Sequence, residues 1–307
     1  MYFPYLRGRQ YELLALKELA QGGLIGKSVI PVVEPVKLSS TFNGTMKTYN
    51  EGGLPIALIL NPDVGDLVSD SAIAPLLSAV SDYVIPSLIL SKNAEGILNQ
   101  LSIQGISESE VLAILTNRDY LDTYRELLAD EQPRFTLFPD ERQIRRAVSK
   151  NKVLFEDKFI KQDKNADYLK KEDEFFSEDH LYFKSEGYVG FGDYSIIGDN
   201  YESGGFAPWA VAIHIVYFSD DNTLRIRHFV SDSNDGIEDV AGKFYEAVSK
   251  LSTWFRNGQS RQLTSALSTL LSHADSGYYP GLPTIKKLSI MHHLELMGKF
   301  LDGGLYK

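Results

Sequence analysis

The sequence contains no cysteine. This absence excludes disulfide frameworks, thiolate nucleophiles, thiolate-bound zinc and iron–sulfur clusters held by cysteine. It also fits a reducing compartment, where disulfides are rare. Carboxylates, arginine, lysine and the six histidines are therefore the groups left to carry acid–base, metal or anion chemistry.

Basic residues are scarce relative to acidic ones. The 307 residues include 31 Lys and Arg against 41 Asp and Glu, which gives a net charge of −10 with histidine neutral. Proteins that coat nucleic acid depend on Lys and Arg to neutralise phosphates, so direct nucleic-acid binding is not expected. A local basic cluster at residues 142–152 is interpreted as a solvated helix face.

Long apolar runs are also missing. Stretches such as residues 55–60 and 210–218 fall far short of the ~20 residues that a membrane-spanning helix needs. After Arg7 and Arg9, charged residues interrupt the leucines, which is typical of an amphipathic helix rather than an export signal. We therefore expect a cytoplasmic protein with no membrane partner.

Short β-branched runs alternate with helix-like segments from residue 28 onward. These runs do not alternate cleanly between apolar and polar residues, as expected for strands that are buried on both faces of a parallel sheet. The predicted strands are 29–33, 56–60, 84–90, 111–115, 134–138 and 152–155. The predicted helices between them are 66–83, 93–101, 118–128 and 140–149. This order predicts the α/β class.

The second half of the chain is less regular. Residues 161–209 form an insertion or loop region, whose charge-rich start at 161–180 is expected to be a solvated helix and loop. Two further strands are predicted at 187–191 and 210–218, and the second begins an antiparallel hairpin with its turn at 220–223. The C-terminal part, 236–307, is predicted to be helical. Its helices are 240–255, 262–271 and 285–301.

Eight predicted strands with helices between most of them indicate a TIM-type (β/α)8-like barrel. We expect one barrel-like domain over residues 1–307, with an extra hairpin and with residues 236–307 packed on it. The alternative is an open doubly wound sheet, because the sequence does not show whether the sheet closes.

Polar residues follow most of the predicted strands. In both architectures, ligands bind beyond the carboxyl ends of the strands. Carboxylates and cations that converge there suit acid–base chemistry, Mg²⁺ or Mn²⁺ held by oxygen ligands, or a phosphate bound by Lys and Arg. The other interpretation is that polar residues end these strands because loops begin there. The residues concerned include Glu34, Asn61, Asp63, Ser91, Lys92, Asn117, Asp157, Lys158, Asp193 and Tyr194.

Two local segments offer further candidates. At the N-terminus, Arg7, Gln10 and Glu12 lie around the start of a predicted helix. They could form an anion clamp in which Glu12 positions Arg7, or an ordinary helix start with an acidic residue in its first turn. Residues 187–209 are rich in glycine and aromatic residues, including Gly205 and Phe206. This stretch is interpreted as a ligand-holding loop or as a rigid lid.

Common catalytic motifs are absent from the sequence. There is no GxGxxG, GxxxxGK[ST], HExxH or GxSxG, so dinucleotide binding, a P-loop, a zinc protease and an α/β-hydrolase nucleophile have no support. His214 and His228 lie in the predicted hairpin, and His292 and His293 are adjacent. We interpret each of these histidines as structural.

Several segments resemble the phage "beta protein" family, found in phages and many bacteria. They are YFPYLRGRQYELLALKELA, IPVVEPV, GFGDYS, AIHIVYF and LRIRHFV, in the family's order and over nearly the whole chain. The matching positions are Arg7, Gln10, Glu12, Glu34, Gly192, Asp193 and Tyr194. The resemblance implies a role in phage–host conflict and a nuclease-like partner. It implies no assigned activity and no catalytic residues.

Two functional hypotheses follow. The first is an interaction or sensing protein of a phage-defence module that acts with a nuclease-like effector. The alternative is a carboxylate- or metal-dependent hydrolase or phosphodiesterase at the barrel mouth, with Glu34, Asp157 and Asp193 as its catalytic candidates and Mg²⁺ or Mn²⁺ as its metal. A structural component without a catalytic mouth is a third possibility. The candidates for binding a ligand, such as a small phosphate-bearing molecule, are Arg7, Gln10, Glu12, Asn61, Lys158, Gly192 and Tyr194.

Overall fold

The structure is a computed structural model, in which the backbone contacts divide the chain into two compact units. Unit 1 consists of Met1–Asp157 and Asp179–Tyr194, and unit 2 consists of Lys158–Glu178 and Ser195–Lys307. The structure describes residues 1–69, 72–91, 93–202, 204, 208–258 and 262–303. The candidates Lys92, Gly205 and Phe206 lie outside the described residues.

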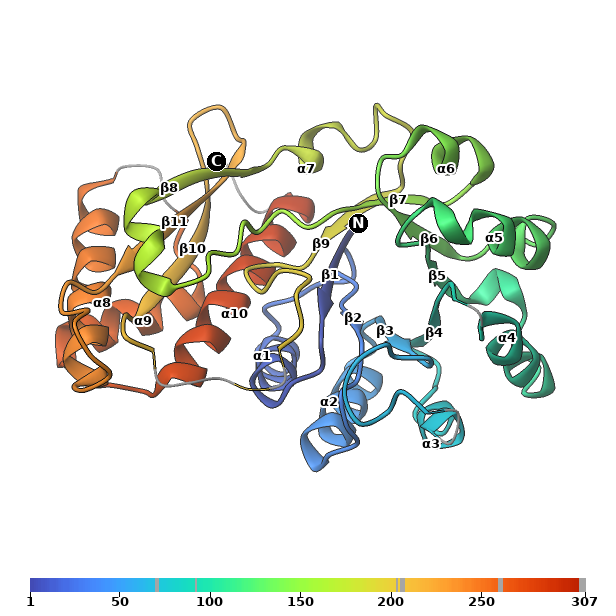
Figure 1. The fold of residues 1–307 in the computed structure, drawn as a ribbon, viewed down its shortest axis with the longest axis horizontal. Helices are drawn as coiled ribbons and strands as arrows, with labels where there is room; N and C mark the ends of the chain where they lie inside the picture. The colour runs from blue at the N-terminus through green and yellow to red at the C-terminus, as the bar shows by residue number, and fades with distance from the viewer. Residues whose placement is uncertain (70–71, 92, 203, 205–207, 259–261, 304–307) are drawn as a thin grey trace. The chain divides into compact units, whose positions relative to one another are not determined.

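Unit 1 is a closed barrel of parallel strands (Figure 1). Its strands are β1 (Tyr2–Leu6), β2 (Val32–Val33), β3 (Ile56–Ile59), β4 (Val84–Ile89), β5 (Leu112–Ile114), β6 (Phe135–Phe138), β7 (Lys152–Phe155) and β9 (Gly190–Asp193). The sheet closes because β1 pairs in parallel with both β2 and β9. The predicted (β/α)8-like barrel is confirmed, and the alternative of an open sheet is wrong.

Helices connect most of the barrel strands. They are α1 (Gln10–Gln21), α2 (Ser40–Glu51), α3 (Ile73–Leu77), α4 (Ala94–Ile103), α5 (Leu121–Leu128), α6 (Arg142–Ala147) and α7 (Asp179–Tyr182). The sequence did not predict α2, although Ser39 caps it by accepting a hydrogen bond from the backbone N–H of Phe42. Conversely, the helix predicted at 66–83 is confirmed only over the five residues of α3 among those described.

The barrel is filled by side chains from alternate positions of its strands. Because neighbouring residues of a strand point to opposite faces, one set packs inside the barrel and the other packs outward. The inward set is Phe3, Tyr5, Ile30, Val32, Ala57, Ile59, Ile85, Ile89, Leu112, Ile114, Phe135, Leu137, Val153 and Phe155. This two-sided burial explains why the aliphatic strands show no polar alternation in the sequence.

One of the predicted barrel strands is wrong. The sequence predicted 210–218 as the eighth strand, but this segment is β10 (Ala212–Phe218) of a separate antiparallel sheet. The missing barrel strand is β1, whose residues precede a predicted helix and were not among the predicted strands. Its YFPYL sequence is aromatic, contains a proline and lacks the aliphatic β-branched signature of the other strands.

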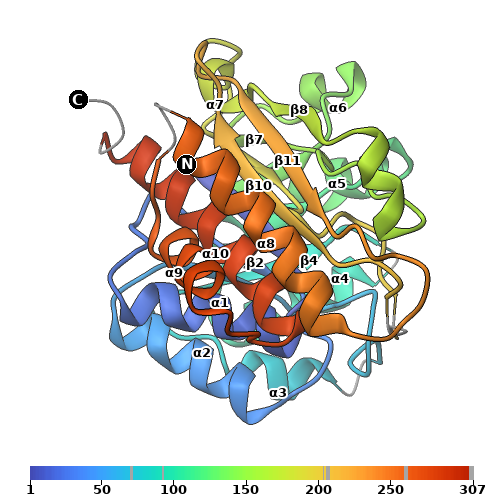
Figure 2. The same ribbon diagram turned by 90° about the vertical axis from the view of Figure 1, so that its left-hand side faces the viewer.

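Unit 2 contains the antiparallel sheet, whose strand order is β10–β11–β8. In the register, β10 pairs with β11 (Leu224–Val230), which confirms the predicted hairpin, and β11 pairs with β8 (Asp173–Ser177). The last strand lies in the segment that was predicted to be a helix and loop, which contains the 3₁₀ turn η4 (Asn165–Lys170) as well. Figure 2 shows α8 alongside β10 and β11.

The predicted C-terminal helices are confirmed as α8 (Val240–Asn257), α9 (Ser265–Ser276) and α10 (Leu282–Leu301). Thr264 caps α9 by accepting from the backbone N–H of Leu267, and Asp239 caps α8 by accepting from that of Gly242. The single-domain arrangement, with these helices packed on the barrel, stays a prediction. Across the residues that the structure describes, no helix combines the length and apolarity needed to cross a bilayer.

Candidate functional site

Arg7 and Glu34 lie next to each other at the carboxyl ends of β1 and β2. The register of the two strands pairs Tyr5 with Val32 and Leu6 with Val33. The ladder continues one step further, because the backbone N–H of Glu34 donates to the carbonyl of Leu6 at 2.9 Å. Since the next residue along each strand points inward again, the Arg7 and Glu34 side chains follow Tyr5 and Val32 into the end of the barrel.

A glycine makes this placement possible. Gly8 has a φ of +62°, and a Cβ at this position would lie 3.0 Å from the carbonyl oxygen of Glu34 and 3.1 Å from Cα of Pro35. A side chain would therefore be strained in conformation and crowded by the end of β2. Gly8 lets the chain turn sharply from β1 into α1 while Arg7 stays at the mouth.

Glu34 is held by three donors. Its carboxylate accepts from the hydroxyl of Tyr5 at 2.8 Å and from the backbone N–H of Asp63 at 2.7 Å, and it forms an ion pair with Nη1 of Arg7. The Glu34 side chain is 0% exposed, whereas that of Arg7 is 13% exposed. A buried carboxylate needs such partners, because an unpaired one would carry a large desolvation cost. Glu34 therefore orients the Arg7 guanidinium.

Aromatic rings surround the guanidinium. Its central carbon lies 5.1 Å from the ring centroid of Tyr5 and 5.5 Å from that of Tyr194, within the range of cation–π attraction. The Tyr5 and Tyr194 rings are 4.9 Å apart, and Phe155 lies 4.9 Å from Tyr194. The guanidinium is thus fixed by a carboxylate and by ring faces at the end of the barrel.

Burial and charge set the protonation states of this cluster. Burial, and then the Glu34 carboxylate, raise the pKa of Tyr5 well above its ordinary value, so Tyr5 is a neutral donor. Burial alone would lower the pKa of Arg7, but Tyr5, Glu34 and Tyr194 together raise it. Burial, and then Glu34, also raise the pKa of Asp63, against the opposing effect of Arg7. The site therefore combines a fixed cation, a saturated carboxylate and a carboxyl group that takes up a proton more readily than usual.

Asp193 does not belong to this cluster, which consists of Arg7, Glu34, Tyr5, Asp63 and Tyr194 and is called the mouth cluster below. On β9, Gly190 and Gly192 face the inward side chain of Phe3, so Phe191 and Asp193 face outward. Asp193 is buried there and accepts a hydrogen bond from the hydroxyl of Tyr2 at 2.8 Å. This predicted catalytic candidate therefore lies on the opposite face of the strand from the mouth cluster.

Two of the predicted ligand-binding residues have structural roles. The Asn61 amide donates to the carbonyl of Ile89 at 2.8 Å and accepts from the same residue's N–H at 2.9 Å, which joins the end of β3 to β4. At Gly192, a Cβ would lie 3.0 Å from Cβ of Phe3 and 3.2 Å from the Phe155 ring. Gly192 therefore lets β9 approach β1 closely. Of the residues in the GFGDYS segment, Tyr194 is the one whose ring lies beside the Arg7 guanidinium.

The N-terminal motif also separates into different roles. The Glu12 carboxylate accepts from the backbone N–H of Arg9 at 3.4 Å as part of a capping box at the start of α1. Gln10 is exposed at the first position of that helix. The structure shows a carboxylate partner of Arg7 in Glu34, and it gives Glu12 the helix-start role that was the alternative interpretation.

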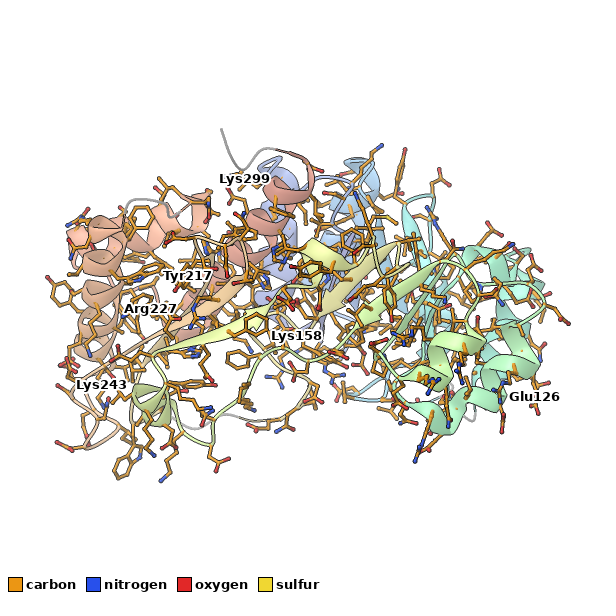
Figure 3. All side chains as sticks on the ribbon, turned by 90° about the horizontal axis from the view of Figure 1, so that it is seen from above. Glu126, Lys158, Tyr217, Arg227, Lys243 and Lys299 are labelled. Carbon is orange, nitrogen blue, oxygen red and sulfur yellow. The ribbon has the colours of Figure 1, made fainter. Side chains whose placement is uncertain are left out.

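The structure does not assemble the predicted metal ligands. Asp157 is exposed at the end of unit 1, and Lys158, labelled in Figure 3, is partly buried at the start of unit 2. Within the described ranges, no group of three or more His, Asp or Glu side chains is arranged to hold a metal ion. The residues present therefore do not fit a Mg²⁺ or Mn²⁺ centre built from Glu34, Asp157 and Asp193.

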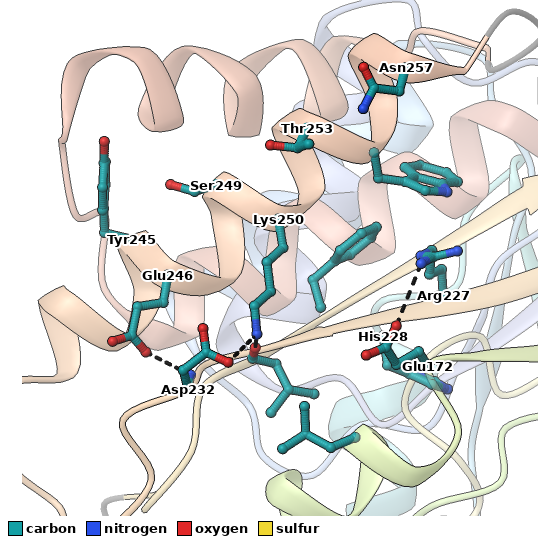
Figure 4. Close-up of a pocket in the computed structure, with 14 residues that line it drawn as sticks. Glu172, Arg227, His228, Asp232, Tyr245, Glu246, Ser249, Lys250, Thr253 and Asn257 are labelled. Atoms are coloured by element: carbon teal, nitrogen blue, oxygen red, sulfur yellow. Dashed lines mark hydrogen bonds and ion pairs between the residues drawn. The ribbon is translucent and has the colours of Figure 1, made fainter.

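Unit 2 holds features that the sequence did not predict. A cavity of about 700 Å³ lies between α8 and β11 and is lined by Arg227, Lys250 and Trp254 (Figure 4). Its lysine is paired with Asp232 at 2.6 Å, and the arginine lies 3.6 Å from Glu172. Each of these cations has a carboxylate partner from the cavity lining itself, so the hollow adds no free cation for an anionic ligand.

The mouth cluster contains two residues whose role the sequence did not reveal. Tyr5 lies in the missed strand β1, and Asp63 was only one of several polar residues after predicted strands. A prediction of β1 beside β2 would have placed Arg7 opposite Glu34. Comparison with family models, with curated proteins and with solved structures finds no match for this chain.

Proposed function

We propose that this protein is the ligand-sensing component of a cytoplasmic phage-defence module, and that it acts with a nuclease-like effector. The resemblance to the phage "beta protein" family supports the setting and the partner. The observation that carries the sensing role is the Arg7 guanidinium, held by Glu34 and by the rings of Tyr5 and Tyr194 at the carboxyl ends of the barrel strands. That end of a (β/α)8 barrel is where such folds bind their ligands.

The proposed ligand is a small molecule that carries a phosphate. A guanidinium binds phosphate oxygens through charge-assisted hydrogen bonds, and a pre-oriented guanidinium loses little conformational entropy when it does so. Tyr194 offers a partly exposed ring beside the guanidinium. The ring can pack against the organic part of the ligand.

Asp63 would take up a proton when the phosphate binds at Arg7. At neutral pH its carboxylate repels a phosphate that approaches Arg7, but its pKa is raised by burial and by Glu34. A phosphate raises that pKa further, because a second negative charge disfavours the ionised carboxyl. Protonated Asp63 donates a hydrogen bond instead of opposing the ligand, so binding is accompanied by proton uptake.

The role in a defence module is tested in cells that carry the gene together with a candidate nuclease-like gene. We expect the two proteins to co-purify, and we expect phage plating to be reduced by the wild-type pair. The Arg7→Met variant should lose this protection, whereas Asp193→Asn, altered outside the mouth cluster, should keep it. Two proteins that neither co-purify nor change each other's toxicity would contradict the proposal.

A second candidate function rests on Asp63 itself. A carboxyl group with a raised pKa beside an arginine can act as a general acid in phosphodiester hydrolysis. The test is hydrolysis of bis(p-nitrophenyl) phosphate by the wild type and by Asp63→Asn. Turnover that Asp63→Asn abolishes would favour a hydrolase, and binding of phosphate without turnover of this ester would favour the sensor.

A further inference from the structure

His214 and His228 form a buried pair in the sheet of unit 2. They lie directly opposite each other in the β10–β11 register, and their Nδ1 atoms are 2.7 Å apart. One ring must therefore donate a proton from Nδ1 and the other must accept it. Both rings pack against Tyr168, at centroid distances of 4.7 Å for His214 and 4.5 Å for His228.

Glu174 on β8 favours one of the two arrangements. The register pairs Glu174 with Ile226, and its Oε1 lies diagonally across the strands, 3.5 Å from Nε2 of His228. A carboxylate can only accept at this contact, which favours the tautomer of His228 that carries its hydrogen on Nε2. Nδ1 of His228 is then the acceptor, and His214 donates from its Nδ1. This tautomer leaves Nε2 of His214 as a bare acceptor.

His214 also lines a cavity. It has a volume of about 270 Å³, and His214 lines it together with Phe159, Tyr168, Leu282 and Ile285. At ~30 Å³ for each water of liquid volume, this is room for about nine waters or a small organic molecule. None of the described residues forms a hydrogen bond with Nε2 of His214. The lining also includes the polar side chains of Gln162, Asn165, Lys286 and Ser289, so the cavity combines aromatic and aliphatic walls with several polar groups, His214 among them.

We propose that this cavity binds a small planar aromatic or heteroaromatic molecule, and that the ligand donates an O–H or N–H hydrogen bond to Nε2 of His214. Ring faces and aliphatic side chains bury the flat body of the ligand, and the acceptor selects a molecule with a donor at its edge. Glu174 and His228 are positioning residues, because they act on the ligand only by setting the tautomer of His214.

The electrostatic surroundings keep the pair neutral. Burial, then His228 and Lys286, lower the pKa of His214, and burial lowers the pKa of His228 to about 4 against the opposing effects of Glu174 and Asp173. Both rings are therefore uncharged at neutral pH, which the acceptor role requires.

The test compares phenol with toluene, which has nearly the same shape but no donor. Binding is followed by NMR titration of the full chain at pH 7, with ¹⁵N-labelled histidine as a second readout. We expect phenol to bind about fivefold more tightly than toluene, the effect of one net hydrogen bond. The ¹⁵N signal of His214 Nε2 should shift on addition of phenol and not of toluene.

Variants separate the acceptor from the walls of the cavity. His214→Phe keeps an aromatic ring and should bind both probes equally. Glu174→Gln should reduce the preference for phenol, because an amide can donate as well as accept and no longer sets the tautomer. His273→Phe on α9 is the matched control and should behave as the wild type. Equal binding of the two probes by the wild type, no binding of either, or a preference that survives in His214→Phe would overturn the proposal.

Discussion

Arg7 and Glu34 are 27 positions apart in the chain and form an ion pair inside the end of the barrel, because β1 and β2 lie side by side in parallel register. The pair links the closure of the fold to the candidate site. It exists only when the N-terminal strand has inserted between β2 and β9. Arg7 is therefore presented at the mouth by the same strand that closes the barrel.

The energy of this pair can be measured by a double-mutant cycle. Arg7→Met leaves the Glu34 carboxylate buried without its cation, and we expect it to lower the free energy of unfolding by about 3–5 kcal/mol. Adding Glu34→Gln should recover part of this loss, because the amide removes the orphaned charge. Its oxygen can accept from the backbone N–H of Asp63 while its NH2 group donates to the hydroxyl of Tyr5. Urea denaturation measures each step. A double variant less stable than Arg7→Met would contradict the assigned pairing.

Removing the Asp193–Tyr2 hydrogen bond should lower the stability of the protein without changing its affinity for phosphate. Tyr2→Phe removes the hydroxyl that donates to a buried carboxylate. We expect it to destabilise the protein by about 1–3 kcal/mol. Asp193→Asn should cost less, because an amide oxygen can still accept from Tyr2. Phosphate titration of both variants should match the wild type. A loss of phosphate binding in folded Asp193→Asn would return this residue to the functional site.

Gly192 predicts a steric effect. In Gly192→Ala the new methyl group would crowd Phe3 and Phe155 where β9 meets β1. We expect a loss of at least about 1–3 kcal/mol, as for overpacking of a core. Gly96→Ala in α4 is the matched control, since a Cβ there meets nothing within 4 Å. That variant should be more stable by up to about 1 kcal/mol, because alanine favours the helix. Thermal unfolding of the pair distinguishes steric crowding from a general intolerance of glycine replacement.

His292 predicts how stability depends on pH. The ring lies between the carbonyl of Val216 and the hydroxyl of Thr264, each at 2.7 Å, and burial lowers its pKa from 6.5 to about 4. Between these pH values the unfolded chain binds a proton that the native state does not bind. The free energy of unfolding should therefore fall as the pH is lowered from 6.5 to about 4, by about 3 kcal/mol for this residue.

The quantity to compare between variants is the change in the free energy of unfolding between pH 6.5 and 4, and not its value at a single pH. His292→Gln loses buried hydrogen bonds and should be less stable at pH 7, but its stability should vary less between pH 6.5 and 4. His273 on α9 is less buried and its pKa is lowered by less, so His273→Gln should reduce the slope less than His292→Gln does. An identical slope in His292→Gln and the wild type would show that His292 does not take part in the acid sensitivity.

Asp63 predicts the pH dependence of the proposed binding. Because its pKa is raised, lowering the pH should protonate it and tighten phosphate binding by Arg7. Asp63→Asn removes the negative charge and should bind phosphate more tightly at pH 7, with less change on acidification. Calorimetric titration at two pH values measures both effects. Weaker binding by Asp63→Asn at pH 7 would mean that the carboxylate helps to hold the ligand.

The sequence predicted the parts of the barrel that depend on local pattern. Aliphatic runs such as residues 56–60 gave strands, because burial on both faces leaves a near-continuous apolar signature. The aromatic and proline-containing β1 lacks that signature. As a result the number of strands was right, while one barrel strand was exchanged for β10.

The candidate site was only partly predictable for the same reason. Glu34, Arg7 and Tyr194 were chosen because they follow strands or lie in unusual motifs, and the structure brings these three together. Their partners depend on register between strands that are distant in sequence, so the sequence did not reveal that Glu34 pairs with Arg7. Asp193 faces outward because Gly190 and Gly192 occupy the inward positions of β9. Since glycine has no side chain, the sequence does not show which residues of this strand face inward.

The most direct test of the sensing role is a titration of the wild type, Arg7→Met and Asp193→Asn with inorganic phosphate, monitored by calorimetry on protein shown to be folded by circular dichroism. The wild type should bind phosphate, and Asp193→Asn should bind it equally. Arg7→Met should bind phosphate at least about tenfold more weakly, the loss expected for a charge-assisted hydrogen bond. No phosphate binding by the wild type, or equal binding by Arg7→Met, would contradict it.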